Sequence, residues 1–370
     1  MKTSSLKKHI ALGSAVAALA FTANLHAAVN VFIEGGSASQ NLLYDRATNL
    51  FLNPTYPGGT LTVSGAASAA VRRFQGTSAN PALSGYGTIT LDINVNNGAV
   101  AGLQALANQT TGTGDTNILG QQLVPSIVDS ATSPEAVSID SVAANFSAYP
   151  TFVVPLVFIK NSNSADTAAI TNLTQRQAVS LETSTNSTRY FGGTSTNQVF
   201  FIGRNSQAAV RTEIDLNIYN TLNIQTYFTN SSGQPTRDFS GDPGLTAGGA
   251  VANTVLVLTN AIGTVAVQNL KSGLVSIPYE GVPYSAANVI NGSYPLWGYE
   301  NYYFIAAGSG VNGALSSAQQ AVLDTFYQSV TNAAFQAQVG GVFTNNFIPN
   351  SALRVYRDFD GGQIKPLPNY

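Results

Sequence analysis

Two arginines beside a strand-to-helix turn are the residues of this chain whose type and spacing best suit anion chemistry. Arg204 follows the apolar run VFFIG, and Arg211 lies seven residues later. The run predicts a buried strand, and apolar residues at helical spacing from Val210 onward predict a helix. Free N–H groups at a helix start, the helix dipole and planar guanidinium forks all favour a small oxyanion. The stretch therefore predicts an oxyanion-binding turn; a surface turn with two solvated arginines is the alternative.

Three earlier stretches repeat this pattern, because each predicted strand ends in small hydroxyl or acidic residues. The strands are expected at residues 29–33, 60–64 and 123–128, and each is expected to run into a helix, the second through residues 70–74. The residues at these turns are Ser37, Ala38 and Ser39; Ser64 and Ser68; and Asp129 and Ser130. In an α/β sheet, ligands bind at the carboxyl ends of strands, so these turns are expected to converge. A buried carboxylate such as Asp129 needs a hydrogen-bond donor. The donor is either a backbone N–H at a helix start, which Asp129 would cap, or a hydroxyl of the ligand, which a partly protonated oxyanion would supply.

The first 27 residues read as an export signal. A basic start precedes an apolar stretch at residues 10–23, and a cleavage site follows at Leu25-His26-Ala27. Both histidines and the only methionine lie in this segment, and the chain has no cysteine. The mature chain would therefore lack the side chains for Ser-His-Asp or Cys-His catalysis and for His- or thiolate-bound metals. We predict a non-enzyme without cofactor or metal, located in the periplasm or outside the cell.

The charge of the mature chain argues against a nucleic-acid partner. Removal of three signal lysines from the 16 Lys+Arg leaves 13, against 18 Asp+Glu, a formal charge of −5. A mildly acidic, charge-poor surface does not attract a polyanion. No base, nucleophile or metal-ligand set accompanies the four turns in the sequence, so a binding protein is expected, and we predict a monomer.

Several further segments organise the predicted fold. Residues 77–117 read as a decorated insertion, and the long apolar run at residues 149–159, broken by Pro155, reads as a strand that crosses between lobes. A helix is expected at 316–338, and Pro134 suits the first turn of another. The aromatic segment Tyr279–Tyr303 favours packing at a domain seam over a sugar platform. The tail from residue 348 is expected to rest on the first lobe.

The order of these pieces resembles the phosphate-binding protein of phosphate ABC transporters, within the type 2 periplasmic-binding-protein superfamily. The similarity extends over roughly residues 29–345. The motifs that carry it are GGSAS, VSGAAS, VDSATSP, VVPLVFIKNSN leading to ITNLTQRQA, AIGTVAV, GSYPLWGYENYYF and the long final helix. It implies an α/β fold of two lobes with the ligand cleft between them, a small phosphate-like oxyanion as ligand, and an ABC-transporter permease as partner.

The resemblance also implies ligand contacts. They would come from Ser37, Ala38, Ser39, Ser64 or Ser68, Asp129, Ser130, Arg204 and Arg211. The sequence departs from the family at Ala208-Ala209-Val210, where Ser-Gly-Thr is usual. Two hydroxyl donors would be lost, each worth about 1.5–3 kcal/mol to a charged ligand.

We therefore predict a signal peptide at 1–27, a first lobe at 28–150 plus 295–370, and a second lobe at 151–294. The predicted function is an exported solute-binding protein for a small oxyanion, phosphate first. One alternative is a surface or extracellular interaction protein that kept the fold and lost phosphate binding. Another is a hydrolase that uses Asp129 and Glu34, which the absence of histidine disfavours.

Overall fold

The computed structural model describes residues 28–67, 69–111, 115–116, 122–139, 145–332 and 346–368. The predicted signal peptide lies outside these residues and stays a prediction. No helix in these ranges is long and apolar enough to cross a membrane.

One mixed sheet of twelve strands runs through both halves of the molecule, in the order β2-β3-β4-β1-β7-β15-β8-β13-β10-β9, with β14 and β16 also paired to β8. Its longer strands are β1 (Val29–Gly35), β2 (Thr60–Ser64), β3 (Val71–Thr77), β4 (Ile89–Asn94), β7 (Ile127–Ser130), β8 (Phe146–Asn161), β10 (Gln198–Ile202), β13 (Ala261–Ala266), β14 (Leu274–Ile277) and β15 (Trp297–Ile305). The shorter strands are β5 (Asp115–Thr116), β6 (Gln122–Leu123), β9 (Asn186–Ser187), β11 (Tyr227–Thr229), β12 (Pro235–Arg237), β16 (Ile348–Pro349), β17 (Val355–Tyr356) and β18 (Lys365–Pro366). The helices are α2 (Gln40–Phe51), α3 (Ala99–Ala107), α4 (Gln175–Thr183), α5 (Ala209–Ile218), α6 (Gly248–Val257), α7 (Ala286–Ile290) and α8 (Ser317–Thr331).

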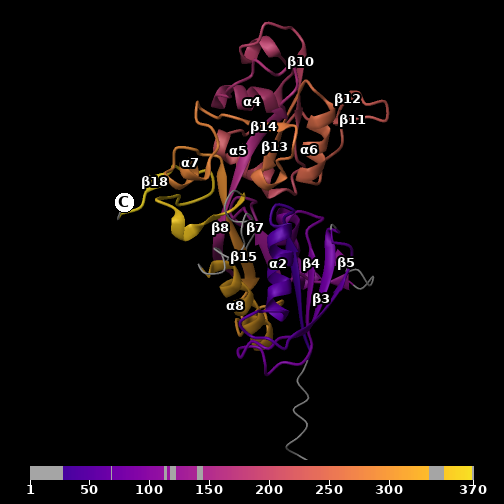
Figure 1. Cartoon of the computed structure of the whole chain (residues 1–370), viewed down its shortest axis with the longest axis vertical. Coiled ribbons are helices and arrows are strands. Elements are labelled where there is room, and N and C mark those ends of the chain that lie inside the picture. Colours follow the sequence, from indigo (N-terminus) through magenta and orange to yellow (C-terminus); the bar gives the residue numbers. More distant parts are fainter. Residues whose placement is uncertain are drawn as a thin grey trace, which may run out of the picture.

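Figure 1 shows these elements as two lobes joined at a narrow waist, with β8 and β15 passing through it. The first part of β8 pairs with β15, and its second part pairs with β13 and β14. The change of partner falls at Pro155, which cannot donate to a strand ladder. The prediction that this segment crosses between lobes is confirmed. The domain boundaries remain a prediction.

Helices cover both faces of the first lobe's sheet. On one face, α2 packs against α8, and both lie close to the sheet (Figure 1). On the other face, α3 packs on β1 and β7, where Leu103, Leu106 and Val128 belong to a small core of their own. Alternate residues of β1, namely Val29, Val31 and Ile33, belong to the main core on the other face.

Several sequence predictions are confirmed by these elements. They are the strand and helix around Ser37, the strand and helix around Arg204, the strand at residues 261–266, and the start of the long helix at its Ser316 cap. The helix is expected to reach residue 338; α8 ends at Thr331, and residues 333–338 lie outside the described residues.

The helix predicted at residues 70–74 is wrong, because this segment is strand β3. Arg73 pairs with Asp92 of β4 at 2.7 Å, while Phe74 is fully buried on the opposite face. Side chains that alternate between two faces are typical of a strand. The stretch before β3 connects it to β2, its antiparallel neighbour. Arg72 and Arg73 therefore lie on a strand and not on a helix face.

Three other expectations are corrected. The region at 77–117 is not a mere decoration, since it contains the buried central strand β4 and helix α3. Residues 134–138 form turns and not the expected helix. The tail was expected on the first lobe, but the backbone N–H of Arg354 bonds to the carbonyl of Ile290, and Gly361 lies against Leu216 of α5. The tail therefore packs on both lobes, because Ile348 and Pro349 also pair with the first part of β8, and the Asp360 carboxylate accepts from the Ser133 N–H at 2.6 Å.

Candidate functional site

A small cavity lies where the two lobes meet. The first lobe lines it with the turn Gly36–Ala38, the start of α3 at Gly98 and Ala99, Ala131, and Glu300. The second lobe lines it with Arg204 and residues 208–210. Its volume is about 20 Å³. That is room for a single water molecule.

Parallel strands bring Ser39 and Asp129 together behind this cavity. Gly35 of β1 is in register with Asp129 of β7, so the turn after β1 lies over the end of β7. The Ser39 hydroxyl contacts the Asp129 carboxylate and makes no hydrogen bond to cap its own helix. The donor that a buried Asp129 was expected to need is thus supplied within the protein.

Asp129 also lies against a second acid, Glu300, which the sequence analysis missed. Both side chains are buried, and their carboxyl groups are within hydrogen-bonding contact. Burial raises the pKa of Asp129 to about 6. Burial, with the nearby charge of Asp129, raises the pKa of Glu300 well above its usual value. Two carboxyl groups this close do not readily ionise together, so the pair holds a proton more strongly than two separate acids would.

The position of Glu300 results from a β-bulge. The register of β15 against β8 shifts between Glu300 and Asn301. A bulge redirects a side chain locally, and bulges are common beside functional sites. A glutamate inside the aromatic-rich run YENYYF was the sequence signal that could have identified it.

Arg204 is the cation of the site. Its side chain is only 3% exposed, and it donates from Nε to the Leu245 carbonyl at 3.0 Å and from Nη2 to the Thr246 carbonyl at 2.6 Å. Neither bond uses Nη1. Burial lowers the pKa of Arg204 to about 10, so the group stays charged at neutral pH. Within the described residues, no carboxylate forms a salt bridge with it.

Arg211 does not accompany Arg204 into the cavity. Its guanidinium lies 3.5 Å from the Asp215 carboxylate and 3.8 Å from that of Asp242. It is not among the residues that line the cavity. The structure therefore separates two arginines that were predicted to act as one clamp.

The predicted serines are divided in the same way. Ser37 lines the cavity; its buried hydroxyl has no hydrogen-bond partner among the described residues, and its carbonyl accepts from Gln268 of the second lobe at 2.7 Å. Ser130 is buried and bonds to Thr132 in a local turn. Ser64 lies on the outermost strand, away from the cavity lining. Ser68 lies outside the described residues.

The start of α3 is a further contact that the sequence analysis did not assign. Gly98 has φ +91°, and a Cβ there would lie 2.2 Å from the carbonyl oxygen of Gln207. The Val100 N–H donates to that same carbonyl at 3.2 Å. A glycine is therefore required for this close approach of the two lobes. The sequence NNGAV, with a turn pair before an apolar run, was the available signal.

The starts of α2, α3 and α5 and the Arg204 guanidinium together favour an anion. Glu300 disfavours an anion, and Val210 and the alanines that line the cavity offer no side-chain hydrogen-bond donor. Across the described ranges, no group of three His, Cys, Asp or Glu side chains is placed to hold a metal ion. The site has the chemistry of a binding cleft whose polar groups are few.

A sheet that continues through a waist into two α/β lobes, with a polar site between them, is the two-lobe periplasmic-binding-protein fold, and the chain has this fold. It is similar to a structure described as a phosphate ABC transporter substrate-binding protein with bound phosphate from Clostridium perfringens. The TM-score is 0.55 at 13% identity, over 86% of this chain and 99% of that one. An ABC-type phosphate transport receptor from Vibrio cholerae also matches, with a TM-score of 0.49 at 13% identity over 84% and 98% of the two chains.

No protein-family model matches the chain, and no curated protein matches it. At 13% identity the first of these likenesses establishes the fold alone. The ligand has to be argued from the site itself.

Proposed function

We propose that this chain is a solute-binding protein whose ligand is a small oxyanion, phosphate before others, held between the lobes at Arg204. The observation that carries the proposal is the buried guanidinium of Arg204, which is bound to two carbonyls and to no described carboxylate. Taking a guanidinium out of water is costly, and an anionic ligand bound to it would offset part of that cost. The phosphate bound by the C. perfringens protein is consistent with this choice of ligand.

The proposed contacts are fewer than the sequence predicted. They are Nη1 of Arg204, the Ser37 hydroxyl and the backbone N–H of Ala38, all from residues that line the cavity. Ser39 and Asp129 lie outside the cavity lining, where the Ser39 hydroxyl donates to the Asp129 carboxylate. We leave Ser64, Ser130 and Arg211 out of the proposed contact set, because each lies away from the cavity lining.

Binding requires the lobes to separate, since about 20 Å³ is too small for phosphate. Opening would break the contacts of Gln268 with Ser37 and of Val100 with Gln207. The strands β8 and β15 would bend near Pro155, where the pairing partner changes. Hinges of this kind need only a few residues to absorb the change.

Calorimetry on the refolded, ligand-stripped chain tests the proposal. Phosphate, sulfate and a short carboxylate would each be titrated, and phosphate is expected to bind most tightly. Arg204→Met should weaken binding about ten- to a hundredfold, the effect of losing one charged hydrogen bond of about 1.5–3 kcal/mol. Arg211→Met is the matched control and should change the affinity little. An equal loss in both variants would place the site elsewhere.

A second candidate is a binding-protein fold with a permanently closed cleft, used as an interaction protein. It is favoured by Ala208, Ala209 and Val210, which line the cavity where hydroxyl donors would serve an anion, and by Glu300, which repels one. Absence of heat with every anion in the calorimetry would favour this candidate. The triple change Ala208→Ser, Ala209→Gly and Val210→Thr would then separate the two: it should raise phosphate affinity only if the remaining site is competent.

Export and delivery to an ABC-transporter permease are part of the same proposal. They rest on the predicted signal peptide and on the fold. Mass spectrometry of the chain secreted by a bacterial host would test export, and the expected mature protein begins at Ala28. Retention of the first 27 residues would contradict it.

A further inference from the structure

A second cavity lies in the first lobe, at the end of α2 remote from the cleft. It is formed by the last turn of α2, the loop after it, Asn80 and the outer face of α8, and its volume is about 300 Å³. The twelve residues of α2 place its two ends about 18 Å apart. The cavity is therefore separate from the cleft at Arg204, and its size is at the lower end of small-molecule sites.

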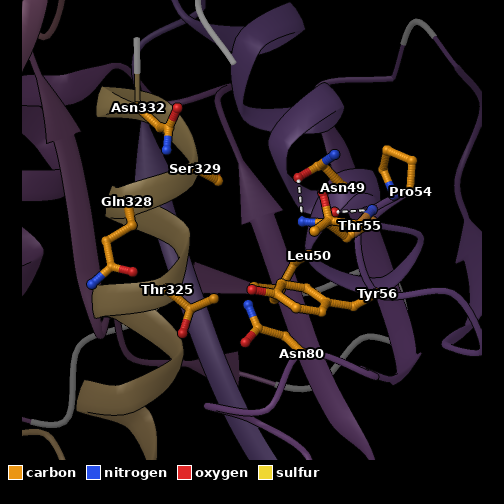
Figure 2. Close-up of a pocket in the computed structure, with 11 residues that line it drawn as sticks. Asn49, Leu50, Pro54, Thr55, Tyr56, Asn80, Thr325, Gln328, Ser329 and Asn332 are labelled. Atoms are coloured by element: carbon orange, nitrogen blue, oxygen red, sulfur yellow. Dashed lines mark hydrogen bonds between the residues drawn. The ribbon is translucent and has the colours of Figure 1, made fainter. Parts of the chain in front are cut away.

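Its lining is polar and carries no charge. Asparagine, glutamine, threonine, serine and tyrosine side chains make up most of it, with Leu50 and Pro54 as the apolar members. Figure 2 shows Tyr56 reaching toward α8, with Asn80 beside its ring. The nearby Arg46 is buried and donates to the backbone carbonyl of Ser329, so its charge does not face the cavity.

Several of these polar groups have capacity left for a ligand. The amide oxygen of Asn49 accepts from Asn53 at 3.4 Å, and that of Asn80 accepts from the Ala82 N–H at 3.0 Å. Their amide NH₂ groups, and the Tyr56 hydroxyl, have no hydrogen-bond partner elsewhere in the described part of the chain. These are donors that a bound molecule could satisfy.

Two further groups on α8 are suited to accept. The Thr325 hydroxyl donates to the Ala321 carbonyl at 2.9 Å, and the Ser329 hydroxyl donates to the Phe326 carbonyl at 2.6 Å. Each hydroxyl has thus used its single proton within the helix and keeps its lone pairs for an incoming O–H. The cavity therefore offers both donors and acceptors from two sides.

We propose that this cavity binds a neutral, polyhydroxylated ligand, a mono- or disaccharide, against the Tyr56 ring. A sugar hydroxyl both donates and accepts, which matches amide NH₂ groups facing hydroxyl oxygens. The ring of Tyr56, 37% exposed, gives an apolar surface for the C–H face of a sugar. An anion would find no cation in the lining, and an apolar ligand would leave the amides unpaired.

Saturation-transfer NMR and calorimetry on the full mature chain test this proposal. The probes are glucose, N-acetylglucosamine, maltose and cellobiose at millimolar concentration. At least one is expected to bind saturably. Tyr56→Ala should weaken that binding about tenfold or more, whereas Tyr56→Phe and Asn49→Ala should each weaken it about fivefold, the effect of one neutral hydrogen bond of about 1 kcal/mol.

Tyr190→Ala is the matched control, because Tyr190 is similarly exposed at 42% but belongs to the other lobe. It should leave sugar affinity unchanged, as should saturating phosphate and the Arg204→Met change. Far-UV circular dichroism and thermal unfolding would show that each variant is folded. No binding by any of the four sugars, or binding that the Tyr56 and Asn49 changes leave unaltered, would overturn the proposal.

Discussion

Replacing Asp129 by Asn should flatten the dependence of stability on pH. Asp129 is fully buried against the Ser39 hydroxyl and the Glu300 carboxyl, and Arg46 and Tyr302 act on the same cluster. An amide keeps the shape: its oxygen can accept from Ser39, and its NH₂ can donate to Glu300. It removes only the ionisation.

The size of the effect follows from the pKa of Asp129, which burial raises from 3.8 to about 6. Between these values the folded state binds more protons than the unfolded chain, so the free energy of unfolding falls as pH rises. This contribution is fully present below pH 3.8 and lost as pH passes 6. At about 1.36 kcal/mol per pH unit, the interval amounts to about 3 kcal/mol. Removal of the Asp129 charge also lowers the raised pKa of Glu300, which acts in the same direction.

Urea unfolding of wild type and Asp129→Asn from about pH 4 to about pH 7 measures this directly. The stability of the variant relative to wild type should improve by about 3 kcal/mol across that range. Glu135→Gln, on an exposed acid, is the control and should run parallel to wild type. Parallel curves for Asp129→Asn as well would refute the reasoning, because Asp129 would then titrate as it does in the unfolded chain.

Two further predictions concern single positions. Gly98→Ala should lower the free energy of unfolding, measured by urea titration, by about 1–3 kcal/mol, because φ is +91° and the new Cβ would meet the Gln207 carbonyl at 2.2 Å. Gly85→Ala is the control and should be nearly neutral, because the space around Gly85 is open. Ser316→Ala removes the capping box of α8 and should lower the thermal midpoint by the equivalent of about 1 kcal/mol, while Ser317→Ala beside it should not.

The sequence was sufficient where neighbouring residues alone decide a structure. The apolar run and helical spacing around Arg204 predicted β10 and α5, and residues 261–266 were predicted as a strand with the bounds of β13. Both are local patterns, in which the period of apolar residues selects helix or strand. The need of a buried Asp129 for a donor was also evident, since it follows from burial alone.

Where the local sequence pattern is compatible with both a helix and a strand, the tertiary structure decided between them. Residues 70–74 follow an alanine-rich turn and were predicted as a helix, but they belong to β3, whose pairing with β4 aligns Arg73 with Asp92. Backbone pairing and a buried ion pair across the sheet outweigh a weak helical preference. Neither contact is visible within the segment itself.

The candidate site depended even more on long-range contacts. Arg211 was grouped with Arg204 by sequence, yet its guanidinium lies beside Asp215 and Asp242, the latter 31 residues further along the chain. Glu300 reaches Asp129 because β15 lies beside β7 and carries a bulge at that residue. A side chain's chemical type is set by sequence, but its partner is set by sheet register and lobe packing. The sequence therefore determined which residues could bind an anion, and the tertiary structure decided that Arg204, and not Arg211, lines the cavity, together with the acid Glu300.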